Sequence, residues 1–130
     1  MIVLDASAVL ELLLRTPNAE PVERRLFASR QTLHAPHLLD VEIAQVVRRY
    51  AAAGEIDQER GRAVLADLSD LPLHRYPHDV LLPRIWGLRH NLTAYDAAYV
   101  ALAEALDAPL LTRDQRLAAT AGHHARVELV

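Results

Sequence analysis

The segment from residue 92 to residue 117 constrains the fold more than any other part of the chain. Its run Ala97–Ala103 is apolar on every face of a helix, and such a helix is stable only when it is buried. Thr93 is a good N-cap for this helix, and Pro109 lies just beyond its expected end. Leu110–Thr112 then has the composition of a short interior strand. A buried helix followed by a buried strand is typical of α/β proteins with a parallel sheet.

The rest of the chain continues this alternation. Further strands are expected at residues 2–4, 32–35, 73–76 and 127–130. Helices are expected at residues 7–16, 19–28, 40–53, 57–68 and 79–90. We see no repeat, low-complexity tract or linker that would divide the chain. The sequence therefore predicts a single α/β domain over residues 1–130.

Two aromatic residues test how far a helical pattern predicts burial. Phe27 follows Val22 and Leu26 in the helix expected at 19–28, and we expect it to point inward with them. Trp86 is the single tryptophan of the chain. We expect it to pack beside Ile85, although an exposed tryptophan would also suit stacking on a nucleic-acid base.

Composition excludes several classes of site. There is no cysteine, which removes disulfides, thiolate metal ligands and cysteine nucleophiles. No basic segment precedes the first apolar run, and no apolar run approaches the length of a membrane span. A cytoplasmic protein without a membrane partner is the expectation. All 14 basic residues are arginine, and the net charge of −3 argues against a general nucleic-acid coat protein.

Four acidic residues occupy positions where α/β proteins bind ligands. Asp5 and Asp114 follow expected strands, at the edge where parallel strands end. Glu42 and Asp96 are expected in the first turns of helices. Each acid alone is explained by helix capping. Four carboxylates brought together would repel one another unless a cation lay between them.

The type of ligand atom indicates which cation such a site would hold. Carboxylate oxygens without sulfur favour Mg²⁺ or Mn²⁺ over Zn²⁺. A cation of this kind polarises a phosphoryl group and activates bound water, which is the chemistry of phosphodiester hydrolysis. His34 and His37 are separated by Pro36, which argues against one helical ligand face. The scattered glycines form neither a phosphate-binding loop nor a dinucleotide fingerprint.

Taken in order, these segments resemble PIN-domain ribonucleases of the VapC toxin type, the toxic half of type II toxin–antitoxin pairs. The resemblance spans the chain. It is carried by the sequences IVLDASA at residues 2–8, LDVEIA at 39–44, YDAAYVALA at 95–103 and LLTRDQRL at 110–117. The family fold, a central and mainly parallel β-sheet flanked by α-helices, agrees with the pattern of the elements.

The resemblance also implies a catalytic centre and partners. The acidic quartet that holds Mg²⁺ and activates water would be Asp5, Glu42, Asp96 and Asp114. Asp5 and Asp96 would be its principal metal ligands, and Mn²⁺ could replace Mg²⁺. Ser7 and Thr112 stand where the family often has a hydroxyl residue that supports the site. The family further implies a VapB-like antitoxin, whose tail covers the acidic cleft, and commonly a toxin homodimer.

Two questions stay open at the level of sequence. Arg113 and Arg116 flank Asp114 and could hold RNA phosphates, or they could belong to an ordinary solvated helix start. The chain could also be a catalytically silent PIN-like module that binds RNA or protein. Another metal-dependent phosphodiesterase, a DNase or a phosphomonoesterase would share the same metal chemistry.

Overall fold

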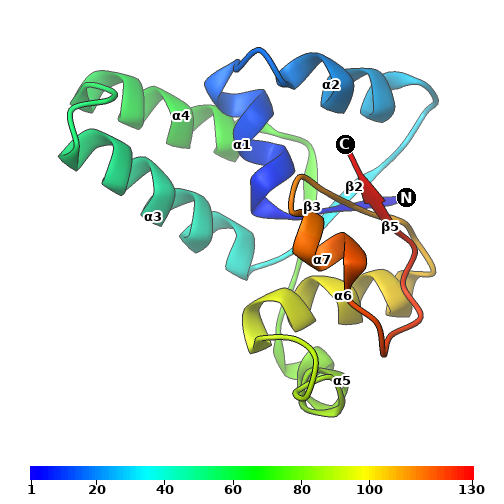
Figure 1. The fold of residues 1–130 in the computed structure, drawn as a ribbon. Coiled ribbons are helices and arrows are strands. Elements are labelled where there is room, and N and C mark those ends of the chain that lie inside the picture. Colours follow the sequence, from blue (N-terminus) through cyan, green and yellow to red (C-terminus); the bar gives the residue numbers. More distant parts are fainter.

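Five parallel strands form the centre of the computed structural model, which describes residues 1–130 (Figure 1). The strands are β1 (Ile2–Leu4), β2 (Leu33–Pro36), β3 (Leu73–Tyr76), β4 (Leu110–Thr112) and β5 (Val127–Leu129). Their order across the sheet is β3-β2-β1-β4-β5, and every neighbouring pair is parallel. The expected strands and their parallel arrangement are thus confirmed.

The strand order places a switch in chain direction at the middle of the sheet. From β1 the chain moves outward through β2 to β3, and it then returns to add β4 and β5 on the other side of β1. In open α/β sheets the crevice beyond the strand ends at such a switch is the usual ligand site. Here that crevice lies beyond the carboxyl ends of β1 and β4.

The helices lie in two groups, one on each face of the sheet, as right-handed crossovers require when the chain reverses direction. The helices are α1 (Ala6–Leu14), α2 (Ala19–Phe27), α3 (Leu38–Ala52), α4 (Gln58–Asp70), α5 (Leu82–Gly87), α6 (Ala94–Leu106) and α7 (Gln115–Ala119). Helix α1 packs against α2, α3 and α4, and α3 and α4 pair as a hairpin. Helix α6 packs against β1, β2 and α5. In Figure 1, α2 and α4 lie above the sheet and α5 and α6 below it.

Helix α6 is as buried as its sequence predicts. All seven residues from Ala97 to Ala103 are buried. The small alanine side chains let the helix approach β1 and β2 closely, while Tyr99, Val100 and Leu102 fill the core. Asp107 ends the helix in a left-handed conformation with φ 48°.

The helices expected at 79–90 and 40–53 differ from the prediction. The first is split into a short 3-10 turn, Asp79–Leu81, followed by α5 with Pro83 in its first turn. The second begins earlier, at Leu38, because the Nε2 atom of His78 accepts a hydrogen bond from the Leu38 backbone amide. His78, which directly precedes the 3-10 turn, thus caps the helix. Glu42 consequently lies in the second turn of α3 rather than in the first.

The expectation that Phe27 and Trp86 are packed inward is wrong. Phe27 is 77% exposed, because Val22 and Leu26 already fill the buried stripe of α2, which ends at Phe27. Trp86 is 69% exposed on the short helix α5. The guanidinium of Arg89 lies 4.5 Å from its ring centre.

None of the helices has the length and apolar character that crossing a bilayer would require.

Candidate active site

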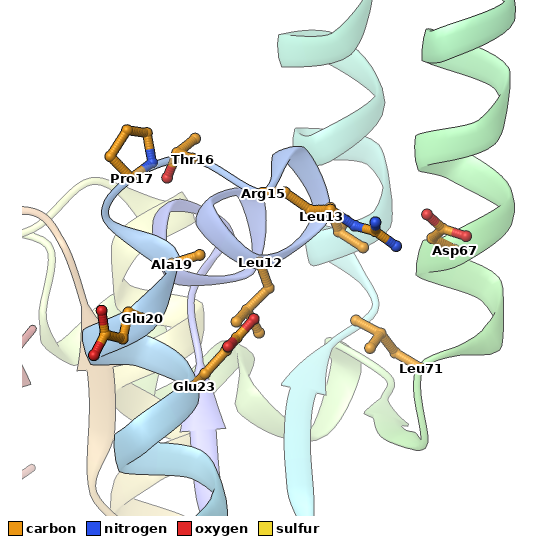
Figure 2. Close-up of a pocket in the computed structure, with 10 residues that line it drawn as sticks. All are labelled: Leu12, Leu13, Arg15, Thr16, Pro17, Ala19, Glu20, Glu23, Asp67 and Leu71. Atoms are coloured by element: carbon orange, nitrogen blue, oxygen red, sulfur yellow. The ribbon is translucent and has the colours of Figure 1, made fainter.

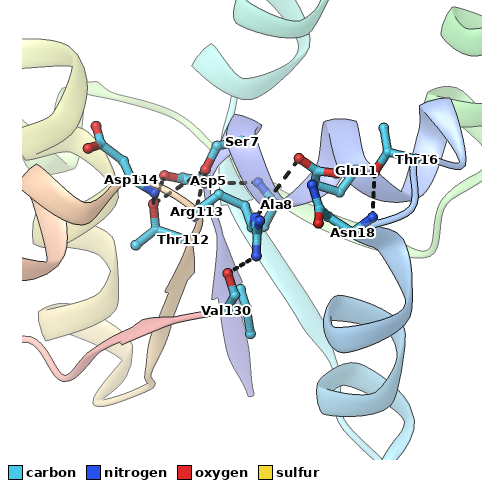
Figure 3. Close-up of polar contacts among 10 residues, drawn as sticks. All are labelled: Asp5, Ser7, Ala8, Glu11, Thr16, Asn18, Thr112, Arg113, Asp114 and Val130. Carbon is cyan, nitrogen blue, oxygen red and sulfur yellow. Dashed lines mark hydrogen bonds and ion pairs between the residues drawn. The ribbon is translucent and has the colours of Figure 1, made fainter.

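Asp5 anchors the crevice between β1 and β4. It follows β1 directly and caps α1, since its Oδ1 atom accepts the Ala8 amide at 3.2 Å. Oδ1 also accepts a hydrogen bond from Ser7 Oγ at 2.6 Å, and Oδ2 accepts one from Thr112 Oγ1 at 2.5 Å (Figure 3). Only 7% of Asp5 is exposed. Residues from two neighbouring strand ends therefore fix one carboxylate in a single orientation.

The same two hydroxyl groups organise the turn that carries Asp114. Thr112 Oγ1 accepts the Asp114 amide at 2.9 Å, and Ser7 Oγ accepts the Arg113 amide at 2.9 Å. Asp114 in turn caps α7, because its Oδ1 atom accepts the backbone amides that open this helix. Both of these hydrogen bonds end on Oδ1, and Asp114 Oδ2 accepts no hydrogen bond from the protein. The capping role predicted for Asp114 is present, and one oxygen remains free beside it.

Helices α6 and α3 bring the other two carboxylates to this edge. Asp96 lies in the first turn of α6, where Thr93 Oγ1 accepts its backbone amide at 3.2 Å. This cap does not use the Asp96 side chain. Glu42 approaches from the second turn of α3, and its Oε1 atom accepts a hydrogen bond from the hydroxyl of Tyr99. The contact with Tyr99 joins α3 to α6.

The pKa values of Glu42 and Asp96 show that the other carboxylates act on them. Burial raises the pKa of Asp5 above its ordinary value despite the hydrogen bonds that it accepts. Burial also raises the pKa of Glu42, and the nearby charges of Asp96 and Asp5 raise it further. For Asp96, burial raises the pKa first, followed by repulsion from Asp114 and Asp5. The quartet is therefore one electrostatic cluster with Asp96 at its centre.

The two arginines beside Asp114 lie in different environments. Arg113 is 28% exposed; its guanidinium donates to the Val130 carbonyl and lies 3.9 Å from a Glu11 oxygen (Figure 3). The side chain of Arg116 is 95% exposed, with its Nε atom 4.0 Å from Asp114 Oδ1. Arg113 thus holds the fold together, whereas Arg116 is exposed to solvent beside the acidic cluster.

The donor set suits a hard divalent cation. The cluster offers carboxylate oxygens, and no basic side chain forms a hydrogen bond with any of them. No three of its side chains, nor any other three acidic or histidine residues, lie at the spacing of a closed metal cage. Mg²⁺ does not need such a cage, because it keeps several waters and binds through one or two carboxylates. The residues present therefore fit Mg²⁺ in charge, ligand type and openness.

A groove of about 480 Å³ leads to the cluster along α1 and α3. Ser7 and Glu42 lie at its acidic end, and most of its remaining wall is apolar. A roomier hollow of about 690 Å³ lies between the end of α1, the start of α2 and α4 (Figure 2). None of the quartet lines this second hollow. The groove, rather than the larger hollow, is the approach to the carboxylates.

The histidines lie apart from this cluster. His34 is buried within the sheet, and its two ring nitrogens are hydrogen-bonded to Tyr76 and Thr32. Its ring also stacks on His74 at 4.9 Å. Burial lowers the pKa of His34 below the ordinary histidine value. These contacts give His34 a structural role in the strands.

Tyr99 is the member of the site that the sequence pattern did not single out. It stands in a run that otherwise contains only apolar residues, three positions after Asp96. A buried tyrosine hydroxyl usually finds a hydrogen-bond partner. That rule signals that Tyr99 needs a polar neighbour, but only the folded structure identifies this neighbour as Glu42.

Comparison with known proteins gives consistent results. The PIN domain family matches residues 2–123. Ribonuclease VapC12 of Mycobacterium tuberculosis is 45% identical over 130 residues, which cover 100% of this chain and 99% of the relative. Ribonuclease VapC9 of the same organism is 48% identical over 120 residues, 92% of this chain and 91% of the relative. A toxin–antitoxin complex from Klebsiella pneumoniae contains a chain with a similar fold, with a TM-score of 0.66, 17% identity, and coverage of 92% and 91%.

Proposed function

The chain belongs to the PIN-domain family, and we propose that it is a metal-dependent endoribonuclease, the toxin of a type II toxin–antitoxin module. Relatives that match nearly the whole chain are named VapC ribonucleases. The observation that carries the proposal is the acidic cluster at the β1–β4 crevice, where burial and neighbouring carboxylates raise the pKa of Glu42 and Asp96 and no arginine forms a hydrogen bond with any of the four acids. Carboxylates with raised pKa values that share a crevice are typical of functional sites.

The residues of the cluster would serve as metal ligands or as supports of those ligands in the proposed reaction. Asp96 and Asp5 would be the principal ligands of Mg²⁺, or of Mn²⁺ in its place, with Glu42 and Asp114 completing the site. When bound, the cation would supply positive charge to the phosphoryl oxygens and lower the pKa of water. Ser7 and Thr112 keep Asp5 in one orientation through their hydroxyl groups.

The surroundings of the cluster suit an RNA substrate. Arg116 is exposed beside Asp114, and its guanidinium geometry matches a phosphate. Arg113 is held by Val130, so we assign it to positioning the β4–α7 turn rather than to gripping the substrate. The exposed side chain of Tyr95, next to Asp96, offers an aromatic face near the reacting phosphate.

The proposed module also requires partners. We propose that an antitoxin of the VapB type covers the groove beside Glu42, whose wall contains Leu10, Leu38, Val41 and Val46. The likeness to a chain from a toxin–antitoxin complex supports this part of the proposal. We further propose a toxin homodimer. The exposed apolar side chains of Val80, Leu82 and Trp86 around α5 support it, because a self-association surface would cover them.

Cleavage of a total-RNA mixture tests the function. Wild-type protein, freed of antitoxin, should cleave RNA with Mg²⁺ and should stop when EDTA is added. Asp96→Asn should lower the rate by at least about 100-fold, because it removes an anionic ligand of the cation that would activate water and polarise the phosphoryl group. It should still fold, since the Thr93 cap uses the Asp96 backbone. Asp70→Asn, an exposed change at the end of α4, is the matched control and should cleave like wild type.

Substrates of other classes distinguish the alternatives. Parallel reactions contain single- and double-stranded DNA and a phosphomonoester. Metal-dependent cleavage of DNA but not RNA would replace the proposal with a DNase. An Asp96→Asn variant as active as wild type would remove Asp96 from the site. Folded wild-type protein that binds RNA or a protein but cleaves none of these substrates would favour a silent binding module.

A further inference from the structure

We propose that Tyr99 is a positioning residue that holds Glu42 in the acidic cluster, an inference that rests on the proposed function of that cluster. Tyr99 is only 2% exposed, and its hydroxyl donates a hydrogen bond to Glu42 Oε1. The two residues are 57 positions apart, on α6 and α3. The contact therefore fixes the two helices that carry Glu42 and Asp96 relative to each other.

The position of Tyr99 on α6 makes it suited to this role. Residues three positions apart lie on the same face of a helix. Asp96 and Tyr99 thus face the same edge of the sheet, one turn apart. Helix α6 is itself packed against β1 and β2. The phenol is consequently a rigid support, whereas a longer and more flexible side chain would not hold its partner as firmly.

Glu42 needs such a support more than Asp5 and Asp114 do. Asp5 is held by two hydroxyl groups and a backbone amide, and Asp114 is held by the amides that open α7. The hydrogen bond from Tyr99 is the only one that the Glu42 side chain makes with the protein. Glu42 also lines the open groove beside α3. Without Tyr99, repulsion from Asp96 and Asp5 would drive its flexible side chain away from the cluster and into this groove.

The experiment compares Tyr99→Phe with Tyr76→Phe, which removes the hydroxyl of another partly buried tyrosine that is bonded to His34. Calorimetric titration with Mn²⁺ measures metal affinity without any catalytic turnover. Tyr99→Phe should weaken Mn²⁺ binding or lower kcat about 10- to 100-fold, the usual effect of removing a group that orients a ligand. The KM for RNA should change little. Tyr76→Phe should match wild type in all three quantities, and circular dichroism should show that both variants are folded.

A double-mutant cycle with Glu42→Ala shows whether Tyr99 acts through Glu42. If it does, Tyr99→Phe should have no further effect on Mn²⁺ affinity or kcat once Glu42 is alanine. A similar loss with and without Glu42 would indicate a general packing defect and overturn the inference. Unchanged Mn²⁺ affinity and kcat in Tyr99→Phe would overturn it as well.

The readouts separate this inference from the proposed function. If wild-type protein binds Mn²⁺ but cleaves no RNA, the ribonuclease proposal fails, while the Mn²⁺ affinities still decide the role of Tyr99. If wild-type protein neither binds Mn²⁺ nor cleaves RNA, both are overturned. If wild-type protein cleaves RNA and Tyr99→Phe does so equally well, with unchanged Mn²⁺ affinity, only the role of Tyr99 is overturned.

Discussion

Glu104 and Glu128 each accept two hydrogen bonds from an arginine, whereas no carboxylate of the quartet accepts any from a basic side chain. Arg84 joins α5 to Glu104 of α6, with distances of 2.8 and 3.1 Å. Arg25 joins α2 to Glu128 of β5, with distances of 2.6 and 3.0 Å. The paired glutamates hold elements together at the periphery of the fold. The quartet lies at the crevice without such partners.

The pKa values of the paired glutamates and of three members of the quartet shift in opposite directions. Hydrogen bonds from Arg25 lower the pKa of Glu128 below its ordinary value. Burial alone would raise the pKa of Glu104, but the hydrogen bonds from Arg84 and the His124 amide outweigh it and lower the pKa. In Asp5, Glu42 and Asp96 burial prevails, and the pKa is raised. Charge thus stabilises the fold at the periphery and destabilises it at the crevice.

The largest expected effect is that of a divalent cation, which should turn the destabilising charge of the quartet into a stabilising one. At a concentration of about 100 times its Kd, Mn²⁺ should raise the free energy of unfolding by about 2.7 kcal/mol, because it binds only the folded cluster. Urea unfolding with and without Mn²⁺ measures the effect. Glu104→Gln should keep the full gain and Asp96→Asn should lose most of it. An equal gain in Asp96→Asn would show that the cation binds elsewhere.

Removing a paired carboxylate should cost stability. Glu104→Gln should lower the free energy of unfolding at neutral pH by about 1 kcal/mol, since Arg84 loses its counter-ion. Because the pKa of Glu104 is lowered, this contribution is fully present above 4.5, the ordinary pKa of a glutamate, and is lost as pH falls through the pKa of the folded state. Urea unfolding gives the value, and Glu55→Gln, in an exposed turn, is the control. No loss at neutral pH would show that the pair is not stabilising.

In metal-free protein, removing a carboxylate of the quartet should raise the free energy of unfolding, by less than Glu104→Gln lowers it. Asp96→Asn should be slightly more stable than wild type at neutral pH. Because the pKa of Asp96 is raised, wild-type stability falls relative to Asp96→Asn as pH rises from 3.8 through the folded pKa. Below 3.8 Asp96 is protonated in both states and the difference should vanish. Urea unfolding across this range checks the trend. A variant less stable than wild type at neutral pH would contradict it.

Most of the fold could be predicted because its signals are local. The short apolar runs of β1 and β4 and the all-apolar face of α6 require burial wherever they occur, so the alternation of strands and helices can be read directly. Asp5 and Asp114 follow strand ends in the sequence itself. Parallel strands share an edge for their carboxyl ends, which predicts the two acids at the same edge; the pairing of β1 with β4 in the structure brings them together.

Other features depend on partners that are distant in the chain. The early start of α3 comes from the His78 ring, which lies beyond α4 in the sequence. Phe27 and Trp86 are apolar enough for a core, but the tertiary structure places no surface against them. Arg113 and Arg116 are near neighbours with equal charge, yet only Arg113 meets Val130 and Glu11. A local sequence pattern does not predict which distant residues a side chain will contact.

The sequence by itself determined an α/β domain with carboxylates at the ends of β1 and β4, because the apolar runs that require burial and the residues that cap helices are properties of short segments. Only the tertiary structure decided that Tyr99 donates a hydrogen bond to Glu42 and that no arginine forms a hydrogen bond with a carboxylate of the quartet. Those contacts join α3, α6 and the two strand ends across the whole chain. Their energies depend on distances that exist only after the helices have packed on the sheet.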